Sequence, residues 1–396
     1  MALVHRWTVA TAAVLLALST ACAAQVAPAQ AAPTKIVAVQ TGSTKAVPLK
    51  VGIAFDTGGK NDRSFNQAAW EGAQRAAKDF GVKLSLFTPT EDAQGVATRG
   101  AEPLAQGGAD LVIGIGFANK DSVEEAARNH SGAKFAVVDD LPTGDNTVGL
   151  RFREQEGSFL VGYIAGKTSS TGRVGFVGGQ DVPVIHKFEA GFKAGVKFVC
   201  PSCQVFSAYI GTTPAAWNDT ATAGKLAASM QKRGADIIFA AAGGSGAGVV
   251  AQVNAAQCLK AVALPQGVTF KSDLFAALPK SDAYQKRCAG DSRPTFFIGV
   301  DSNQNYLGDD DKNPATLNHG LTSMVKRVDN VVYSLIQDMT RQQNWRTGDQ
   351  SYGLSNGGVG YALDTYNRAL ISPDLKTLLD KVQHLIVYRS IKVPVK

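Results

Sequence analysis

KVGIAFDTGGKNDRSFNQAAWEGAQRAAKD, residues 50–79, sets the pattern for most of the chain. Its first six residues include Val51, Ile53 and Phe55 and predict a buried strand. A polar turn that contains glycine follows, and apolar residues then recur at helical spacing from 66 to 79. A strand, a turn and a helix in this order are half of a βαβ unit, in which helices join parallel strands.

The same alternation continues along the sequence. Further strands are expected at 83–87, 110–115, 134–138, 173–177, 204–210, 236–241 and 296–300. Further helices are expected at 120–130, 157–167, 187–198, 220–233 and 322–340, and a strand at 385–393 is expected to end the tail. Strands that alternate with helices in this way favour parallel sheets covered by helices.

The length and the restart of the pattern after residue 153 both favour two similar lobes. At roughly 150 residues per domain, 396 residues suffice for two or three domains. We expect an α/β fold with two Rossmann-like lobes, each built on a parallel sheet and joined by a hinge. The expected segments are 48–153 with about 304–352 for the first lobe, 154–303 with about 353–396 for the second, and 258–293 as an insertion.

The composition is that of a folded protein. It is 45% hydrophobic and 18% charged, which excludes a disordered, coiled-coil or collagen-like chain. The net charge of +7 comes from 40 basic and 33 acidic residues, and the basic residues are scattered rather than gathered in a run. A nucleic-acid partner is therefore not expected. After residue 24, no segment approaches the ~18 consecutive apolar residues of a membrane span.

The N-terminus has the layout of a secretory signal peptide. A basic start precedes an apolar stretch at 7–18 and small residues at 19–21. Cys22 then follows a small residue, as the lipidated cysteine of a bacterial lipobox does, although Ser19 stands where leucine is usual. We therefore expect 1–21 to be removed and Cys22 to become a lipidated first residue.

An ordinary secreted protein is the alternative, because two A-x-A cleavage sites also occur, at 21–23 and 29–31. The chain is exported under either interpretation. Residues 22–47 carry almost no charge and are rich in Ala, Pro, Gln and Thr, which favours a flexible tether. With the lipid, the tether would anchor the body at the cell membrane, facing the periplasm or the cell exterior.

Four further cysteines would lie in an oxidising compartment, where disulfides are the default. Cys200 and Cys203 form a C-x-x-C motif, and Cys258 and Cys288 flank much of the expected insertion. We favour one bond within each of these two pairs. A redox role would need a thioredoxin-like setting, and a four-cysteine zinc site would need a second C-x-x-C, so these two alternatives are disfavoured.

Carboxylates and glycines follow most of the expected strands. Two open α/β lobes bring the carboxyl ends of their strands to a shared crevice, where such sheets bind ligands. The residues expected at this crevice are 56–59, 116–117, 139–140, 178–179, 242–244 and 301–302. Asp and Gly dominate this set, so the crevice should offer carboxylates and exposed backbone amides to a ligand.

Ser245 carries the main feature that suggests an enzyme. Residues 243–247, GGSGA, nearly match the G-x-S-x-G elbow of hydrolases but end in Ala247, and a triad would need His319 or His384. The same glycines lack the third Gly of G-x-G-x-x-G, which argues against a dinucleotide cofactor. The five histidines are too scattered to suggest a metal site. We expect no cofactor and no metal.

The turn within 56–72 has two interpretations. Its acceptors, amides and Phe65 could hold a polar ring by edge hydrogen bonds and a stacking face. Alternatively, Asp62 or Ser64 caps the start of a helix and Phe65 is buried in the core. The local sequence does not decide between a binding loop and a capped helix.

Several linked motifs, in order, resemble the BMP family, the PnrA-like nucleoside-binding lipoproteins of bacterial ABC importers. The resemblance extends from about residue 50 to near the C-terminus. Besides 56–72, the motifs are EGSFLVG (156–162), VGFVGG (174–179), FEAGF (188–192), ADIIFAAAGG (235–244), GVDS (299–302) and LTSMVKRVD (321–329). The resemblance implies a type I periplasmic-binding-protein fold whose two lobes close on a nucleoside.

The family's binding residues fall on matching positions of this sequence. The resemblance places the two stacking aromatics at Phe65 and Phe188 and the ribose contacts at Asp301 and Lys326. The other positions that it implies are Gly243 and Gly244 for close backbone approach, and Asp56, Asp62, Asn66 and Asp139 for base-side or loop contacts. The sequence departs from the family in the Cys200 and Cys203 pair and in the long segment 258–293, which either covers the cleft or, as we favour, is a surface excursion.

The chemistry of these residue types is consistent with such a ligand. Two Phe rings can stack on a neutral heterocycle, and the Asp301 carboxylate can accept hydrogen bonds from ribose hydroxyls, with Lys326 as a donor that also neutralises it. No Arg cluster or glycine-rich helix start for a phosphate is evident, which favours a nucleoside over a nucleotide.

The sequence therefore predicts a binding protein and not an enzyme. We expect an exported, monomeric lipoprotein that captures purine or related nucleosides and presents them to an ABC permease in the cytoplasmic membrane, with closure by a hinge. A binder of a sugar or another small polar solute on the same fold is the first alternative. A secreted serine hydrolase that uses Ser245 is the second.

Overall fold

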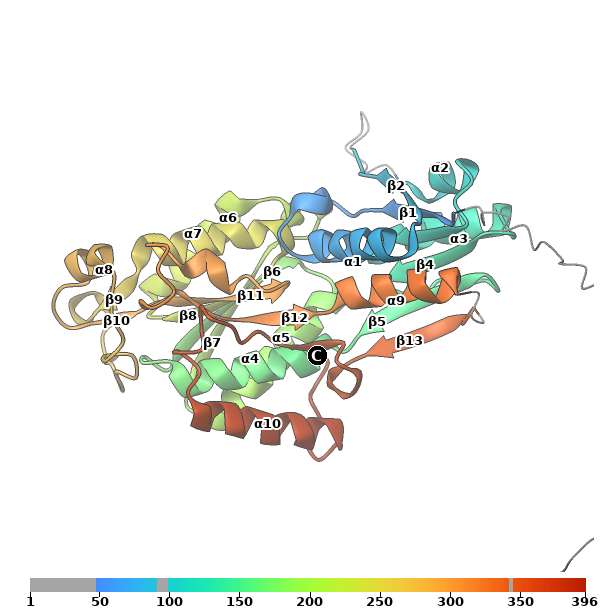
Figure 1. The fold of residues 1–396 in the computed structure, drawn as a ribbon. Helices are drawn as coiled ribbons and strands as arrows, with labels where there is room; N and C mark the ends of the chain where they lie inside the picture. Colours follow the sequence, from blue (N-terminus) through green and yellow to red (C-terminus); the bar gives the residue numbers. More distant parts are fainter. Residues whose placement is uncertain (1–47, 91–98, 342–344) are drawn as a thin grey trace, which may run out of the picture. The chain divides into compact units, whose positions relative to one another are not determined.

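The computed structural model describes residues 48–90, 99–341 and 345–396. Within these residues, the strands form two six-stranded sheets and one two-stranded sheet (Figure 1). The expected signal peptide at 1–21, the lipidated Cys22 and the tether that extends to residue 47 lie outside the described part. In the described part, no helix combines the length and the apolar character that crossing a bilayer requires.

The first sheet is entirely parallel and has the strand order β13-β5-β4-β3-β1-β2. Its strands are β1 (Lys50–Ala54), β2 (Lys83–Phe87), β3 (Leu111–Gly114), β4 (Lys134–Val138), β5 (Thr147–Phe152) and β13 (Gly348–Tyr352). The central strands β1, β3 and β4 are almost completely buried, as expected for a parallel sheet covered on both faces.

The second sheet has the order β14-β12-β11-β8-β6-β7 and is parallel except for its edge strand β14. Its strands are β6 (Arg173–Gln180), β7 (Gln204–Gly211), β8 (Ile237–Ala241), β11 (Phe296–Asp301), β12 (Gly320–Lys326) and β14 (Val359–Tyr361). The small antiparallel sheet pairs β9 (Cys258–Lys260) with β10 (Ser292–Pro294). This arrangement confirms the α/β class with parallel sheets.

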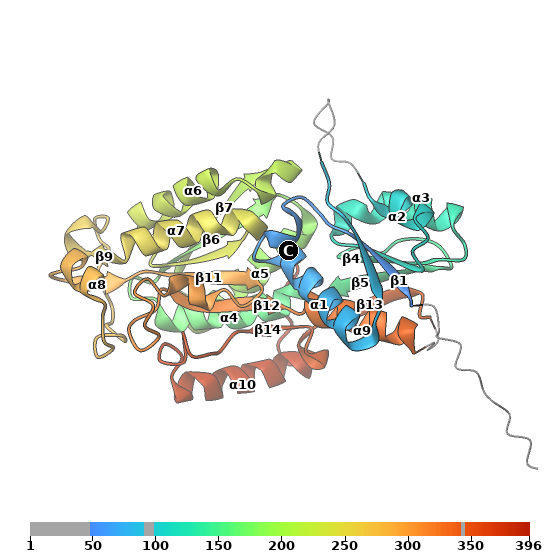
Figure 2. The same cartoon turned by 45° about the horizontal axis from the view of Figure 1, so that its top comes forward.

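Helices cover both faces of each large sheet (Figures 1 and 2). The helices of the first sheet are α2 (Ala101–Gln106) and α3 (Lys120–Asn129) on one face and α1 (Phe65–Phe80) and α9 (Val328–Thr340) on the other. Those of the second sheet are α6 (Thr220–Lys232) and α7 (Gly246–Ala256) on one face and α4 (Glu154–Thr168) and α5 (Pro183–Val199) on the other, with α10 (Pro373–Val387) against α4. We call each sheet with its helices a lobe.

The chain passes between the two lobes three times: from β5 to α4, from β12 to α9, and between β13 and β14. Backbone hydrogen bonds tie these three segments together. Arg153 N donates to Tyr352 O at 2.7 Å, and Arg327 N donates to Gly358 O at 2.9 Å. Three adjacent crossings are where a hinge between the lobes would lie.

The expected return to the first lobe near residue 304 is wrong, and so is the expected helix at 322–340. Gly320–Lys326 is strand β12, paired with β11, and the helix begins only at Val328. The chain therefore stays in the second lobe through Lys326. The reason is that β12 is buried along almost its whole length, and a short buried run does not distinguish a strand from a helix by its periodicity.

The expected strand at 385–393 is also wrong. Its first residues belong to helix α10, which buries Leu375, Leu379, Val382 and Ile386 at helical spacing. The Ser372 hydroxyl accepts a hydrogen bond from Leu375 N at 3.1 Å and caps the helix start. An N-cap serine followed by proline favours a helix start at this place. This preference outweighs the preference for a strand that the β-branched residues near the C-terminus indicated.

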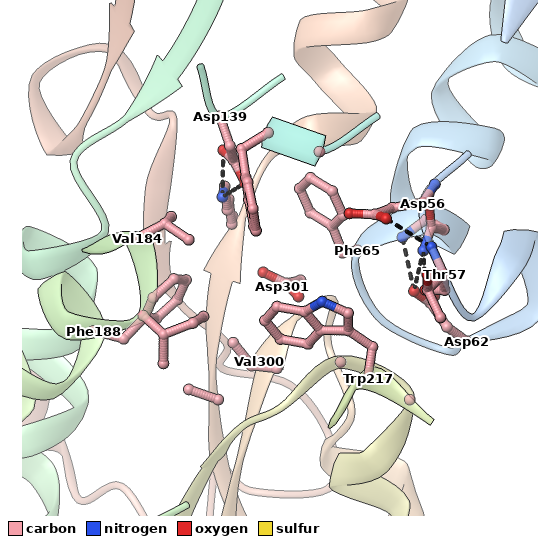
Figure 3. A pocket seen from close by; sticks show the side chains of 18 residues that line it. Asp56, Thr57, Asp62, Phe65, Asp139, Val184, Phe188, Trp217, Val300 and Asp301 are labelled. Atoms are coloured by element: carbon pink, nitrogen blue, oxygen red, sulfur yellow. Dashed lines mark hydrogen bonds and ion pairs between the residues drawn. The ribbon is translucent and has the colours of Figure 1, made fainter. Parts of the chain in front are cut away.

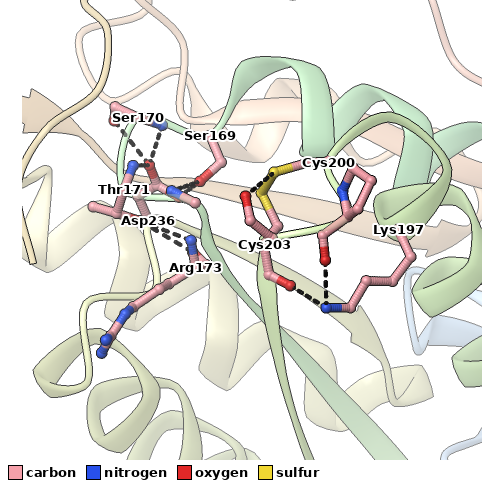
Figure 4. Close-up of a disulfide and its surroundings, with 11 residues drawn as sticks. Ser169, Ser170, Thr171, Arg173, Lys197, Cys200, Cys203 and Asp236 are labelled. Carbon is pink, nitrogen blue, oxygen red and sulfur yellow. Dashed lines mark hydrogen bonds between the residues drawn. A yellow bond between two sulfur atoms is a disulfide. The ribbon is translucent and has the colours of Figure 1, made fainter.

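Both expected disulfides are present. Cys200 is bonded to Cys203, with an S–S distance of 2.01 Å, in the turn between α5 and β7 (Figure 4). Lys197 Nζ donates to Cys203 O at 2.6 Å and reinforces this turn. In the nearby turn before β6, the buried Asp236 carboxylate accepts hydrogen bonds from Ser169, Ser170 and Thr171. The C-x-x-C motif is a structural bond at the opposite end of β7 from the strand's carboxyl end.

The second disulfide joins Cys258 to Cys288 across a sequence separation of 30 residues. Replacing both cysteines with alanine should lower the free energy of unfolding by about 3–4 kcal/mol, because the bond closes a long loop. The matched control, alanine at Cys200 and Cys203, should cost only about 2 kcal/mol, since that loop is short. Urea unfolding of the two variants measures the difference, and an equal loss would contradict the loop-length argument.

Candidate functional site

One pocket lies between the lobes at the carboxyl ends of their strands, and all ten predicted site residues line it (Figure 3). They are Asp56, Asp62, Phe65, Asn66, Asp139, Phe188, Gly243, Gly244, Asp301 and Lys326. The space between the atoms amounts to about 570 Å³, a value that includes open solvent at the mouth. No lining residue comes from 258–293, because that segment leads into the amino end of β11.

The strand order of each sheet fixes the spatial order of the pocket residues. In the second lobe, Lys326 ends β12, Asp301 ends the neighbouring β11, and Gly243 and Gly244 follow β8, the next strand. Neighbouring strands are ~4.8 Å apart, so these groups form a row. In the first lobe, the corresponding row is Asp139 after β4, Gly116 after β3 and Asp56 after β1.

The two rows lie alongside each other across the pocket. At one end, Lys326 Nζ lies 2.6 Å from Asp139 Oδ2, which joins β12 to β4. At the other end, a Cβ atom built on Gly244 would lie 3.7 Å from Asp62 Cβ, in the loop after β1. The pocket thus has a Lys326 end and an opposite end near the 56–62 loop.

Lys326 is the centre of a buried charge cluster. Its side chain is 2% exposed, and its ammonium lies 3.1 Å from Glu154 Oε1 as well as next to Asp139. Lys187 contacts the other oxygen of Glu154, Oε2, at 3.1 Å from the more exposed side. Burial by itself would lower the pKa of Lys326, but Asp139, Glu154 and Asp301 together raise it, so the ammonium stays charged.

The two pocket carboxyls near Lys326 hold their protons more tightly than exposed carboxyls do. Burial raises the pKa of Asp301 to about 7, although Lys326 and the Ser64 hydroxyl oppose the rise. Burial likewise raises the pKa of Asp139 to about 6, against the attraction of Lys326. Both groups therefore titrate near neutral pH, which is typical of functional clefts.

Asp139 and Asp301 also share an unusual backbone conformation. Their φ angles are +75° and +62°, in the left-handed region that side chains other than glycine rarely adopt. Each residue follows or ends a buried parallel strand, and the left-handed turn directs its carboxylate into the pocket rather than along the sheet. The energetic cost of such a conformation is of order 1–3 kcal/mol, and two of the six residues other than glycine that adopt it in the described part line the pocket.

Asp301 also connects the two lobes. Ser64, at the start of α1, donates from its hydroxyl to Asp301 Oδ2 at 2.6 Å. Two further bonds cross at the same place: Ser302 Oγ donates to Ser64 O at 3.1 Å, and Gln304 Nε2 donates to Arg63 O at 2.8 Å. The carboxylate predicted to contact a ligand is therefore also part of the contact between lobes.

The loop after β1 combines the two interpretations given to it. The Asp62 carboxylate accepts hydrogen bonds from the backbone N–H groups of Ser64, Asn66 and Gln67 and so caps α1. The Asn66 amide bonds to Asp62 Oδ2 and to Asp56 N, at 2.9 and 3.0 Å. Asp62 and Asn66 therefore hold the loop in shape, whereas Phe65 lines the pocket instead of entering the core completely.

Asp56 is held in place at the end of β1. Its Oδ1 accepts a hydrogen bond from Thr57 N at 2.8 Å and lies 4.0 Å from Arg99. Its Oδ2 lies beside Gly116, where a Cβ atom would come within 2.5 Å of that oxygen. Burial raises the pKa of Asp56. Gly116, which was expected at the crevice but not as a ligand contact, is thus the neighbour that leaves room for this carboxylate.

The two predicted stacking aromatics come from different lobes. Phe65 is the first residue of α1, and Phe188 lies in the second turn of α5. Lys326 Nζ is 5.0 Å from the centroid of the Phe65 ring and 5.7 Å from that of Phe188, so both rings adjoin the same ammonium. This places the aromatic pair at the Lys326 end of the pocket.

Trp217 is the main pocket residue that sequence reasoning missed. It ends the short helix η3 (Pro214–Trp217), just after β7, and its indole points into the pocket (Figure 3). None of the residues expected at the crevice follows the strand expected at 204–210, so Trp217 was not predicted. The sequence feature that could have indicated Trp217 is an aromatic residue six positions after the end of a strand.

Ser245 is placed as a structural residue. It is fully buried, and its hydroxyl donates to Ala216 O at 2.8 Å while accepting from Asp219 N at 2.6 Å. The buried His319 bonds instead to Thr295 O. Ser245 therefore fixes the segment that carries Trp217, and these contacts do not form a catalytic triad.

The comparisons with known proteins identify the family. A family model described as ABC transporter substrate-binding protein PnrA-like matches residues 49–258. The chain is also 36% identical over 360 residues to a CD4+ T-cell-stimulating antigen of Listeria innocua, covering 87% of this chain and 88% of the relative. The chain belongs to the PnrA-like family of ABC transporter substrate-binding proteins.

Two further proteins are similar to this PnrA-like chain. The ABC transporter nucleoside-binding protein BmpA of Lactococcus lactis is 31% identical over 354 residues, which cover 88% of this chain and 90% of the relative. The crystal structure of an ABC transporter solute-binding protein from Aeropyrum pernix K1 matches with a TM-score of 0.67 and 25% identity, covering 88% and 94% of the two chains.

Family membership settles the coarse function. PnrA-like proteins are substrate-binding components of ABC transporters, so this chain has a small-molecule ligand, a membrane permease as its partner and an extracytoplasmic location. The fold is that of the type I periplasmic solute-binding proteins. The pocket between the lobes is where such a fold binds its ligand.

Proposed function

We propose that this protein binds an uncharged nucleoside, purine nucleosides first among them, and delivers it to an ABC permease. The observation that carries the proposal is the aromatic pair: Phe65 and Phe188 adjoin Lys326 from different lobes, one strand away from the Asp301 carboxylate. A base would stack between the rings, and the adjacent ribose would donate its hydroxyls to Asp301.

The charges of the pocket favour a nucleoside over a nucleotide. Asp56, Asp62, Asp139 and Asp301 line it, and Lys326 is the cation among the lining residues. That ammonium is already paired with Asp139 and Glu154, so little positive charge is left for a phosphate. A phosphate would meet net repulsion, whereas a neutral nucleoside would not.

The proposal includes the state of the protein in the cell. Cys22 is lipidated after removal of 1–21, residues 22–47 are the tether, and the body acts as a monomer. The name of the Lactococcus lactis relative supports the ligand class, since it describes that protein as nucleoside-binding. Ligand contacts from both lobes would stabilise the closed arrangement by hinge motion at the three crossings.

Calorimetric titration of the refolded, ligand-free protein tests the ligand class. The panel is inosine, adenosine, guanosine, uridine, free adenine, ribose and the 5′-monophosphate of the tightest nucleoside. We expect at least one nucleoside to bind, and its monophosphate to bind more than about tenfold weaker, because repulsion by the pocket carboxylates costs more than the phosphate gains. Mass spectrometry of the small molecules that co-purify gives an independent reading.

Two results would contradict the proposal. Binding of ribose or another sugar without any nucleoside would place the protein among the sugar binders and remove the stacking role of Phe65 and Phe188. Product accumulation beyond one equivalent, from inosine or from p-nitrophenyl acetate, would indicate an enzyme. The variant Ser245→Ala is the control for the second result, since it removes the candidate nucleophile.

A further inference from the structure

We propose that Gln304 is a positioning residue that sets the distance between Asp301 and Phe65 when the lobes are together, so that one nucleoside can engage both. The inference rests on the proposed nucleoside function and adds to it a residue that determines affinity from outside the pocket. Gln304 is 7% exposed and is not among the described residues that line the pocket. It would therefore act on the ligand through the residues that it holds.

The Gln304 side chain holds the end of strand β11 in the second lobe. Its Oε1 accepts a hydrogen bond at 2.9 Å from Val300 N, directly before Asp301. Asp301 has the left-handed φ of +62° that turns its carboxylate toward the pocket. A Cβ atom on Gly299 would come within 2.6 Å of Gln304 Oε1, so this glycine leaves the amide room to reach the strand. The amide thus supports the turn on which the direction of the Asp301 carboxylate depends.

The same amide reaches the first lobe. Gln304 Nε2 donates to Arg63 O at 2.8 Å, and Arg63 also has a left-handed backbone, with a φ of +56°. Phe65 follows two residues later, and Ser64 between them donates to Asp301. One side chain therefore contacts the backbone next to the proposed ribose contact and the backbone next to a proposed stacking ring.

A glutamine amide suits both contacts because it carries an acceptor and a donor on one planar group. Val300 N needs an acceptor, and Arg63 O needs a donor. The backbone of Gln304 is fixed as well, since its N donates to Ser323 Oγ on the neighbouring strand β12 at 2.9 Å. A buried group whose hydrogen bonds are all satisfied in this way makes its surroundings rigid.

The distance between Asp301 and Phe65 matters because base and ribose are parts of one ligand. A base stacked on Phe65 presents its ribose hydroxyls at a fixed distance, so the Asp301 carboxylate must lie at that distance to accept their hydrogen bonds. Binding sites need their groups held to within about 0.5 Å by supporting residues. Gln304 bonds to both sides of this distance and is the supporting residue.

Two ligands and one substitution test the positioning role. The tightest nucleoside of the panel and its 2′,3′-dideoxy analogue, which lacks the hydroxyls that Asp301 would accept, are titrated into the wild type and Gln304→Met. Methionine has a similar length but no amide. We expect the wild type to prefer the nucleoside by about 30-fold or more and Gln304→Met to prefer it by less than about fivefold. This preference is the readout, because a general loss of stability or of closure would weaken both ligands alike.

Ser323→Ala is the matched control. It removes the partner of Gln304 N and a hydrogen bond to Asn305, at a fully buried position, but leaves both amide bonds of Gln304 in place. It should unfold at a lower urea concentration than the wild type and keep the preference for the nucleoside within about twofold. Gln304→Asn, whose amide is one methylene too short to reach both partners, should relax the preference if the methionine variant does not fold.

The outcomes separate this inference from the proposed function. An unchanged preference in a folded Gln304 variant would overturn the inference, as would an equal loss of preference in Ser323→Ala. A wild type that binds nucleosides but does not prefer them to their dideoxy analogues would also overturn it, since Asp301 would then not be a ribose contact. Failure of the wild type to bind any nucleoside would instead contradict the proposed function.

Discussion

Replacing Lys326 with methionine should lower the free energy of unfolding by about 3–5 kcal/mol and abolish measurable nucleoside binding at pH 8. The side chain is nearly fully buried and is within 3.1 Å of both Asp139 and Glu154. Methionine fills a similar volume but leaves these two carboxylates, and Asp301 nearby, without their cation. A buried charge that loses its partner is one of the most costly changes a protein can suffer.

The loss of stability in Lys326→Met should depend on pH, and the direction of this dependence shows whether unpaired carboxylates cause it. Without Lys326, the buried carboxyls can avoid ionisation only by binding protons, which they do more readily as the pH falls. The destabilisation should therefore be largest at pH 8 and clearly smaller at pH 5. Urea unfolding of the wild type and Lys326→Met at the two pH values measures this difference, together with calorimetric titration of the tightest nucleoside.

Lys187→Met is the matched control, because Lys187 contacts the same Glu154 but is 31% exposed. An ion pair that water can reach contributes little, so this variant should lose less than about 1 kcal/mol and keep its ligand affinity. Equal losses in the two variants, or an unchanged stability of Lys326→Met, would show that the buried cluster does not have the energetic role that its geometry implies.

The fold class could be predicted from the sequence because each buried strand is bounded by turns and followed by a helical period. The two elements that were predicted wrongly have a common cause. Strand β12 (Gly320–Lys326) and helix α10 (Pro373–Val387) are short apolar or mixed segments whose type depends on what they pack against. The error at β12 also moved the expected lobe boundary to about residue 304, since the chain leaves the second lobe only after that strand.

The candidate site could be predicted as a set of residues but not as an arrangement. Motif order pointed to Phe65, Phe188 and Lys326. The rule that ligands bind at strand ends pointed instead to residues such as Asp139 and Asp301. Only the tertiary structure shows that Asp62 caps α1 and that Ser64 bonds to Asp301 across the lobes. Their roles toward a ligand stay predictions.

Changing Asp301 to asparagine should remove most of the pH dependence of nucleoside binding. With a pKa of about 7, Asp301 is largely protonated at pH 5.5 and largely ionised at pH 8. Ribose hydroxyls bond more strongly to the carboxylate than to the neutral acid. Wild-type affinity should thus fall about 10- to 30-fold from pH 8 to pH 5.5, since the ligand must compete with a proton.

Asparagine keeps the shape of the side chain but neither titrates nor carries charge. The Asp301→Asn variant should therefore bind more weakly than the wild type at pH 8, and its affinity should change by less than about threefold across the same range. Asp139→Asn is the comparison, because the pKa of Asp139 is about 6 and Lys326 attracts both carboxylates. The Asp139→Asn variant should still lose affinity between pH 8 and pH 6.5, because protonation of Asp301 causes that loss.

Ionisation of the Asp301 carboxylate has opposite effects on binding and on stability: it strengthens ligand binding but lowers the free energy of unfolding of the ligand-free protein. Because burial raises the pKa of Asp301 to about 7, the folded state binds its proton more tightly than the unfolded chain does, and the stability that this proton provides is lost as the pH rises from about 4 through about 7. Asp301→Asn should consequently be more stable than the wild type at pH 8, by an amount that shrinks as the pH falls toward 4. If Asp301→Asn binds weakly but unfolds at a higher urea concentration than the wild type at pH 8, the carboxylate serves ligand binding at a cost in stability. If the variant is less stable than the wild type at every pH, Asp301 instead stabilises the fold through its bond to Ser64.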